Sequence, residues 1–305
     1  MKIVDRDRRG AAGFTRRVAL SCAAALVLAA AGCDMFKTKP PDIRFAAPAS
    51  TGYQGKMDFA EVEYQLPLTT ADLEKITPEN IALLDQEQVD QIYARLTAGP
   101  IPDGAFDGQI LFPRGSSGKF RTAEIAGGFT GLVLHLKGLE LEKVGEALWH
   151  GKVFYRDERV LRNRIDDLDA LKKVGLVEGE PKKISVGGKD AWLLFPAKLY
   201  CGQSLLDARR ESIIIDYAFT DEISGYQEKP DFLAGRRGLR VRDEIRMVRP
   251  GFYLGRAYLD KVFGLNFTLY NKQIAERDGP PFAKSGQIKE DCWPGTQRRP
   301  VAVAK

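Results

Sequence analysis

Histidine and cysteine are scarce in this 305-residue chain, which contains two histidines, His135 and His150, and four cysteines. Neither histidine lies in an HExxH motif or in another spacing typical of metal ligands, so we expect no metal site. The sequence also lacks a GxGxxG turn, a CxxCH motif and a GxSxG elbow. These absences remove the support for a bound dinucleotide, a c-type haem or a serine hydrolase, and we expect no cofactor.

An excess of positive charge is missing from most of the chain. The formal net charge is +5, but six of the 46 Lys and Arg residues and only two of the 41 Asp and Glu residues lie in residues 1–32. The remainder therefore holds 40 basic and 39 acidic residues. A nearly neutral body gives no electrostatic footprint for DNA or RNA, so we expect no nucleic-acid partner.

The apolar run near the N-terminus is too short to span a bilayer. It covers residues 18–31, which is 14 residues, whereas a transmembrane helix needs about 20. A basic segment precedes it and small residues end it. This order is typical of a secretory signal peptide, which we assign to residues 1–32.

The end of the signal peptide resembles a bacterial lipobox. Ala30-Ala31-Gly32 precedes Cys33, with Ala30 where leucine is more usual. The resemblance implies a bacterial membrane lipoprotein that is lipidated at Cys33 and partners the membrane through this anchor. Asp34 resembles an inner-membrane retention signal, which favours the inner membrane and places the body in the periplasm or otherwise outside the cytoplasm. Arg16-Arg17 resembles a twin-arginine export signal, and Sec export remains the alternative.

Two cysteines remain in the body after processing, Cys201 and Cys292. An even pair in an exported protein suits a disulfide. Such a bridge would close a loop of about 90 residues and would stabilise the fold by about 4 kcal/mol. Two free thiols are the alternative, because spacing in sequence does not fix distance in space.

Composition divides the chain into five segments. Residues 1–32 are the signal peptide, and the Pro- and Gly-rich residues 33–56 read as a lipidated tether. Residues 57–147 form a helical and loop-rich region. Thr77-Pro78 is a typical start for a helix that reaches Leu96, and Ala98-Gly99-Pro100 ends it. An antiparallel β domain follows over residues 148–275, and residues 276–305 are a C-terminal tail.

The β domain is predicted from short segments rich in aromatic and β-branched residues, bounded by Gly, Pro and Asp. These segments are residues 148–155, 190–200, 211–219, 238–248, 251–259 and 262–271, with a helical insertion at 164–175. Few helices intervene, which favours an antiparallel sheet that closes or is barrel-like. The predicted fold class is α+β, with an N-terminal helical region before this sheet.

The segment around Trp149 resembles the opening strand of lipocalin-like (calycin) barrels, which carries a Gly-x-Trp motif. Here Ala147 stands two residues before Trp149, and Gly151 stands two residues after it. The resemblance implies a calycin-like barrel.

The most unusual polar group is the sequence Arg242-Asp243-Glu244-Ile245-Arg246. Strand alternation places Asp243 on the apolar face and Arg246 on the opposite face. A buried carboxylate needs a partner, so Asp243, with an arginine and with Tyr217 or His150, is the candidate group that orients a ligand in a cavity. A structural ion-pair network between strands is the alternative. The ligand-binding candidates are Asp243, Tyr217, His150 and Arg246.

The expected function is non-catalytic binding of an apolar or amphipathic small molecule by a membrane-anchored envelope lipoprotein. One alternative is an enzyme that uses Asp243, Asp216 and His150 as acid–base residues in the same cavity. Another is a structural adaptor in an envelope complex. An open cavity with apolar walls favours binding, a barrel filled by side chains favours an adaptor, and convergent titratable groups favour an enzyme.

Overall fold

The computed structural model describes residues 38–47, 57–114 and 149–295, apart from residues 174, 176 and 187. The chain divides into two units, Met1–Lys39 and Pro40–Lys305, and the fold described below belongs to the second. The predicted signal peptide and the predicted lipidation site Cys33, with Asp34, lie outside the described residues. Within the described ranges, no helix combines the length and the apolar character needed to cross a membrane.

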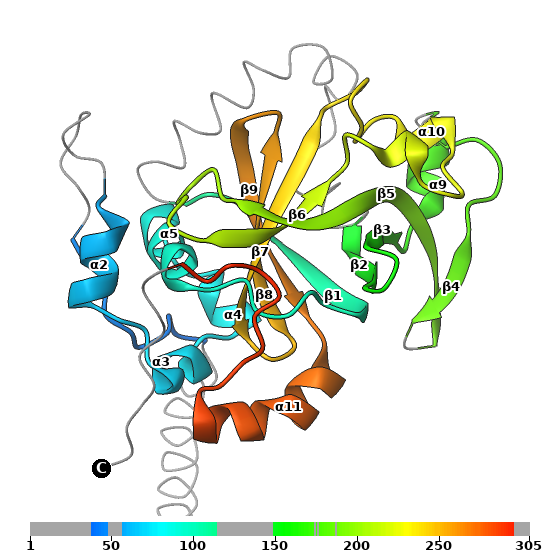
Figure 1. The fold of residues 1–305 in the computed structure, drawn as a ribbon. Helices are drawn as coiled ribbons and strands as arrows, with labels where there is room; N and C mark the ends of the chain where they lie inside the picture. The colour runs from blue at the N-terminus through cyan, green and yellow to red at the C-terminus, as the bar shows by residue number, and fades with distance from the viewer. Residues whose placement is uncertain are drawn as a thin grey trace, which may run out of the picture. The chain divides into compact units, whose positions relative to one another are not determined.

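Eight antiparallel strands close into a barrel (Figure 1). They are β1 Gly104–Leu111, β2 Trp149–Tyr155, β3 Val160–Ile165, β5 Lys189–Gln203, β6 Glu211–Asp216, β7 Val241–Arg249, β8 Phe252–Leu259 and β9 Val262–Tyr270. Each strand of this ring pairs with the next in chain order, and β9 returns to pair with β1. The short strand β4, Lys183–Val186, pairs only with β5 and forms a hairpin beside the ring. The predicted α+β class with a closed, barrel-like antiparallel sheet is confirmed.

Strand alternation sorts the side chains of β7 as the sequence predicts. Asp243 and Ile245 face the barrel interior, where Ile245 belongs to the main hydrophobic core. Arg246 faces the outside of the barrel, where it contacts the helix α5, Gln86–Arg95. Because successive side chains of a strand point to opposite faces, this short segment contributes residues both to the barrel interior and to its outer surface.

Four helices cover the outside of the barrel: α2 Phe59–Gln65, α3 Thr70–Lys75, α4 Pro78–Ile81 and α5. The predicted helix start is correct, since the Thr77 side chain caps α4 and Pro78 is its first residue. The single predicted helix is divided, however, because Asp85 forms a second capping box with Gln88 and starts α5.

A second hydrophobic core joins these helices to the outer surface of the barrel. Leu73, Ile76 and Ile92 are fully buried there against Val248 and Phe252 of the strands. The described part of the predicted tether also packs on this layer. The backbone of Ala46 exchanges two hydrogen bonds with the Gln91 side chain, at 2.8 and 3.1 Å.

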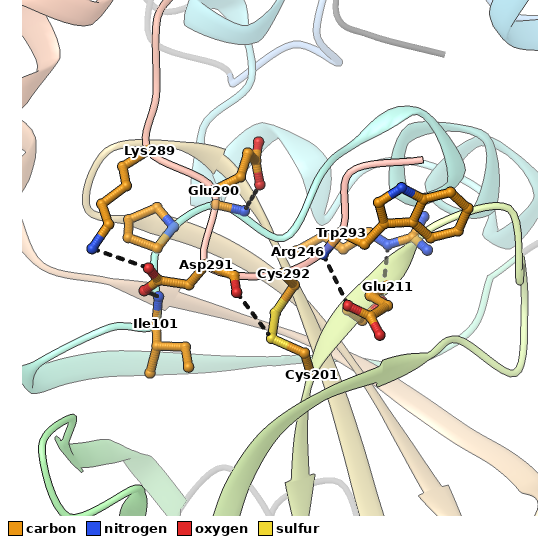
Figure 2. Close-up of a disulfide and its surroundings, with 12 residues drawn as sticks. Ile101, Cys201, Glu211, Arg246, Lys289, Glu290, Asp291, Cys292 and Trp293 are labelled. Atoms are coloured by element: carbon orange, nitrogen blue, oxygen red, sulfur yellow. Dashed lines mark hydrogen bonds and ion pairs between the residues drawn. A yellow bond between two sulfur atoms is a disulfide. The ribbon is translucent and has the colours of Figure 1, made fainter. Parts of the chain in front are cut away.

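The C-terminal part of the chain closes one end of the barrel. After α11, Lys272–Ser285, the backbone crosses this end, and Cys292 forms a disulfide with Cys201 of β5, with their Cα atoms 5.4 Å apart (Figure 2). Asp291 accepts a hydrogen bond from the backbone of Ile101, at 2.9 Å. Residues 276–305 are predicted to be a C-terminal tail. Over their described part they are instead the end of α11 and residues 286–295, called the strap here, which are bound to the barrel.

The opposite end is bordered by short elements that connect the strands. These are α9 Leu168–Lys173, the 3-10 helix η2 Thr220–Glu222 and α10 Glu228–Asp231. The helical insertion predicted at residues 164–175 corresponds to α9. Strand β1 lies in the region predicted to be helical and loop-rich, and the barrel therefore begins before residue 148.

Candidate functional site

The end of the barrel opposite the C-terminal strap contains a cavity of about 340 Å³. This volume lies within the range of small-molecule sites. Most of its walls are apolar side chains from the strands and from the bordering loops: Ile110, Trp149, Ile165, Leu171, Phe195, Leu233, Ala234, Leu239, Val241, Ala257, Leu265 and Phe267. The remaining four lining residues are polar and lie together: Lys152, Asn163, Tyr217 and Asp243.

A β-bulge in β2 turns two of these residues into the cavity. The pairing of β2 with β3 shifts register between Trp149 and Gly151. Both Trp149 and Lys152 therefore line the cavity although they are three residues apart, a spacing that strict alternation would place on opposite faces. Gly151 makes this possible, because its φ is +137° and a Cβ there would lie 2.0 Å from the carbonyl oxygen of Phe106.

Lys152 is the centre of the polar cluster. Its side chain is 3% exposed, and the Nζ donates to Asp243 Oδ2 at 2.9 Å, to Tyr217 Oη at 2.7 Å and to Asn163 Oδ1 at 2.8 Å. An ammonium has three N–H donors, so these three acceptors use all of them. The ion pair with Asp243 joins β2 to β7 across the barrel interior.

The other cluster members also bond to one another. Asn163 donates from Nδ2 to Tyr217 Oη at 2.9 Å and to the carbonyl of Phe195 at 3.0 Å. Its Oδ1 accepts from the Trp149 indole N–H at 2.8 Å as well as from Lys152. Tyr217 in turn donates to Asp243 Oδ2 at 3.3 Å.

One polar atom of the cluster has no hydrogen-bond partner among the described residues. Every hydrogen bond of the Asp243 carboxylate within the described residues ends on Oδ2, and none ends on Oδ1. Asp243 as a whole is only 3% exposed and lines the cavity. Its Oδ1 atom is nevertheless accessible to solvent, since it is not among the inaccessible polar atoms that lack a partner in the described structure. Oδ1 is therefore a hydrogen-bond acceptor that faces the cavity.

Aromatic rings surround the ammonium group. Lys152 Nζ lies 5.3 Å from the ring centre of Trp149, 5.4 Å from that of Tyr217 and 5.2 Å from that of Phe267. These distances are within the range of cation–π attraction. The rings thus supply both apolar wall and part of the stabilisation of a buried charge.

Burial changes the acidity of the cluster. Loss of water lowers the pKa of the Lys152 ammonium, and the neighbouring Asp243 carboxylate opposes this change. Burial, followed by the charge of Asp243, raises the pKa of the Tyr217 hydroxyl well above its ordinary value. Tyr217 therefore remains a protonated donor at neutral pH.

Beneath the cluster the barrel is filled. Along β2 and β7, the next inward residues toward the strap are Phe154 and Ile245, which are 1% and 0% exposed. Phe106 packs edge-on against Phe154 and Tyr253 at this level. Lys152 and its partners therefore form the floor of the cavity, and the apolar side chains form its walls.

The structure brings together two of the four predicted binding residues, Asp243 and Tyr217. His150 does not line the cavity: the bulge turns it outward, where its half-exposed ring lies 3.6 Å from Asp166. The expected partner of Asp243, an arginine, is corrected to Lys152. Asp216, an acid–base candidate, lies outside the cavity and accepts a hydrogen bond from the Tyr200 hydroxyl at 2.7 Å.

Arg246 also lies outside the cavity, because its strand position faces outward. It is fully buried beneath the helical layer, and it donates to Ser212 Oγ at 2.9 Å and to the carbonyl of Tyr93 at 3.2 Å. Two further bonds, each 3.0 Å, reach the carbonyls of Asp207 and Arg210. Arg246 is thus a structural residue that joins the barrel to α5.

Lys152 and Asn163 are the site residues that the sequence analysis missed. The signal for Lys152 is its position two residues before the core residue Phe154 on a predicted strand, which places a lysine on an inward face. Asn163 carries a weaker signal, since it alternates with two arginines in the segment Arg162-Asn163-Arg164.

A second cavity of about 340 Å³ lies at the closed end, between the strap, α11 and the barrel. Its lining includes Tyr253, Ile274 and Ile288. Its charged lining residues are Arg277 and Asp278, which are ion-paired with each other, and Arg156 and Lys289. No buried polar cluster comparable to that of Lys152 is described there.

Comparisons with protein-family models, with curated proteins and with solved structures each give no match.

Proposed function

We propose that this protein is a membrane-anchored envelope lipoprotein whose barrel binds an apolar or amphipathic small molecule without catalysing its conversion. The observation that supports binding is the cavity itself, with apolar walls and a polar floor made by Lys152, Asn163, Tyr217 and Asp243. Concave sites of this composition are typical of small-molecule binding. The structural-adaptor alternative predicts a barrel that is filled by side chains throughout. The cavity does not agree with that prediction.

The bonding of the cluster favours binding over acid–base catalysis. Titratable groups do converge at the floor, but the three donors of Lys152 are all engaged and Tyr217 donates to Asp243. General acid–base chemistry needs a donor and an acceptor that both reach the reacting atoms. Only the acceptor Asp243 Oδ1 is available to a bound molecule.

Binding can be tested with N-phenyl-1-naphthylamine, an apolar dye whose fluorescence rises when it leaves water. The protein used is residues 34–305, called the body protein here, because all the contacts described above lie within Pro40–Lys305. We expect saturable binding of one dye molecule. Ala257→Phe should abolish it, because the added ring would occupy the cavity that Ala257 lines.

The matched control for this experiment is Val262→Phe. Val262 is 43% exposed and does not line the cavity, so the same ring added there should leave dye binding unchanged. Dye binding that Ala257→Phe does not affect would contradict the proposal, as would a body protein that binds no dye.

Anchoring is tested separately on the full chain in a bacterial host. The sequence Ala30-Ala31-Gly32-Cys33 supports cleavage before Cys33 and acylation of its thiol. Several acyl chains, each contributing about 0.8 kcal/mol per buried CH₂, would hold the body at the membrane. Mass spectrometry should find an acylated N-terminal Cys33, and Cys33→Ser should remove the modification. An unmodified mature N-terminus elsewhere would contradict the lipoprotein assignment.

A further inference from the structure

The polar floor restricts which amphiphiles the cavity can hold. This restriction specifies the class of ligand and rests on the proposed binding function. The end of the barrel opposite the strap, called the open end here, is open over the described residues. An amphiphile that enters it places its apolar body between the walls and its polar end on the floor. The atoms available at the floor therefore decide which polar end is accepted.

The floor offers an acceptor and no free donor. Lys152 and Tyr217 use their donors within the cluster, and Asn163 donates to Tyr217 and to the carbonyl of Phe195. Asp243 Oδ1 faces the cavity without a partner in the described structure. A carboxylate oxygen can only accept a hydrogen bond, so the matching group on a ligand must donate one.

The charge of the floor is already balanced. Lys152 and Asp243 form an ion pair in which the two side chains are 3% and 5% exposed. An anionic head group would meet the Asp243 carboxylate and would find no N–H of Lys152 free. A cationic head group would be attracted to Oδ1 but would lie beside the Lys152 ammonium, and it would have to lose its water without a counter-ion of its own.

We infer that the cavity binds a neutral amphiphile whose polar end is a hydroxyl group, which donates its hydrogen bond to Asp243 Oδ1 while the apolar body lies against the walls formed by Ile110, Ile165 and Leu265. Fatty acids and alkylammonium ions are excluded because the ion pair of Lys152 and Asp243 already balances the charge of the floor. Neutral alkyl chains without a donor bind more weakly, because they leave Oδ1 buried without a partner.

Four eight-carbon probes test this inference by displacing N-phenyl-1-naphthylamine from the body protein at pH 7. They are 1-octanol, its isomer 1-methoxyheptane, octanoate and octylammonium. The two isomers contain the same atoms, but only the alcohol can donate a hydrogen bond. We expect 1-octanol to displace the dye at a concentration about tenfold lower than each of the other three.

A double variant provides the control for the role of the floor. In Lys152→Met/Asp243→Leu the acceptor and the ion pair are both removed, so 1-octanol and 1-methoxyheptane should displace the dye equally. The wild-type comparison does not depend on this variant, and it decides the inference even if the variant does not fold.

The outcomes separate this inference from the binding function. Equal or stronger displacement by octanoate, octylammonium or 1-methoxyheptane overturns the hydroxyl specificity, while dye binding that Ala257→Phe abolishes still supports a binding barrel. Absence of dye binding overturns both. A tenfold preference for 1-octanol that is lost in the double variant supports the inference.

Discussion

At the scale of single residues, Lys152 and Asp243 determine the character of the cavity. Each is nearly inaccessible to water, and each supplies the counter-charge of the other at 2.9 Å. A buried ion pair adds little net stability compared with apolar residues of similar size, whereas the loss of one partner leaves an uncompensated charge. The pair therefore makes the floor polar at a small cost, as long as both members are present.

This coupling predicts the behaviour of three variants. Lys152→Met and Asp243→Leu should each lower the free energy of unfolding by about 3–5 kcal/mol, because each leaves a buried charge unpaired. The double variant should be more stable than either single variant. Urea unfolding of the four proteins measures this, and additive losses in the double variant would contradict a paired role.

The sequence analysis identifies one partner of the pair and not the other. Asp243 is recognisable because it interrupts a clear apolar alternation on β7, and the structure places it facing the cavity. Lys152 is recognisable only from its position two residues before the core residue Phe154, because the bulge at Gly151 breaks the alternation on β2 before that point. Strict alternation would group His150 with Lys152, whereas Trp149 is the residue that shares its face.

At the scale of elements, the strands predicted from the sequence are those with apolar alternation. The strands that are not predicted lack this alternation for physical reasons. Strand β1 contains Gly108, which resembles a turn signal. A Cβ at Gly108 would lie 2.4 Å from the Trp149 ring, so glycine is required there by close packing. Strand β3 shows no clear apolar alternation because Asn163, which contributes to the polar floor, lies between the inward residues Leu161 and Ile165.

The bulge in β2 gives a prediction at this scale. Gly151→Ala should destabilise the barrel strongly, by about 3 kcal/mol or more, because the new Cβ meets the Phe106 backbone and φ is positive. Gly104→Ala is the matched control, since its φ is +83° but nothing lies within 4 Å of the added atom. Gly104→Ala should therefore cost only about 1 kcal/mol. Thermal unfolding that ranks the two variants equally would show that the close approach is unimportant.

At the scale of the whole molecule, the barrel has one closed end and, over the residues that the structure describes, one open end. The strap holds the closed end through the disulfide, which spans 91 residues and in the chain-entropy model contributes about 4 kcal/mol. The helical layer covers the outer face through a mainly apolar core joined by the buried Arg246. Composition indicates the helical region and the sheet. The strap has no periodic pattern, and the pairing of Cys201 with Cys292 is the feature of the sequence that indicates its position.

Buried tyrosines predict how stability depends on pH. Burial raises the pKa of Tyr93, Tyr217 and Tyr253. The folded protein therefore holds these protons more tightly than the unfolded chain, in which tyrosine titrates near 10. Their contribution to stability is complete below pH 10 and is lost as the pH rises above it.

Two measurements check this dependence. The urea midpoint of the body protein should fall between pH 9.5 and pH 11, and tyrosinate absorbance should rise later in the folded protein than in the unfolded one. Tyr253→Phe is the control, since it removes one of the groups and should reduce the fall. A midpoint independent of pH over this range would contradict the burial of these hydroxyls.

The most direct test of the binding site is a methyl NMR titration of the body protein with 1-octanol. A ligand in the open end should cause saturable shifts of the Ala257, Ile165 and Leu265 methyl groups, which line that cavity. The methyl groups of Ile274 and Ile288, which line the cavity beside α11, should not move. Saturable shifts centred on Ile274 and Ile288, or the absence of any saturable shift, would contradict a ligand site at the open end of the barrel.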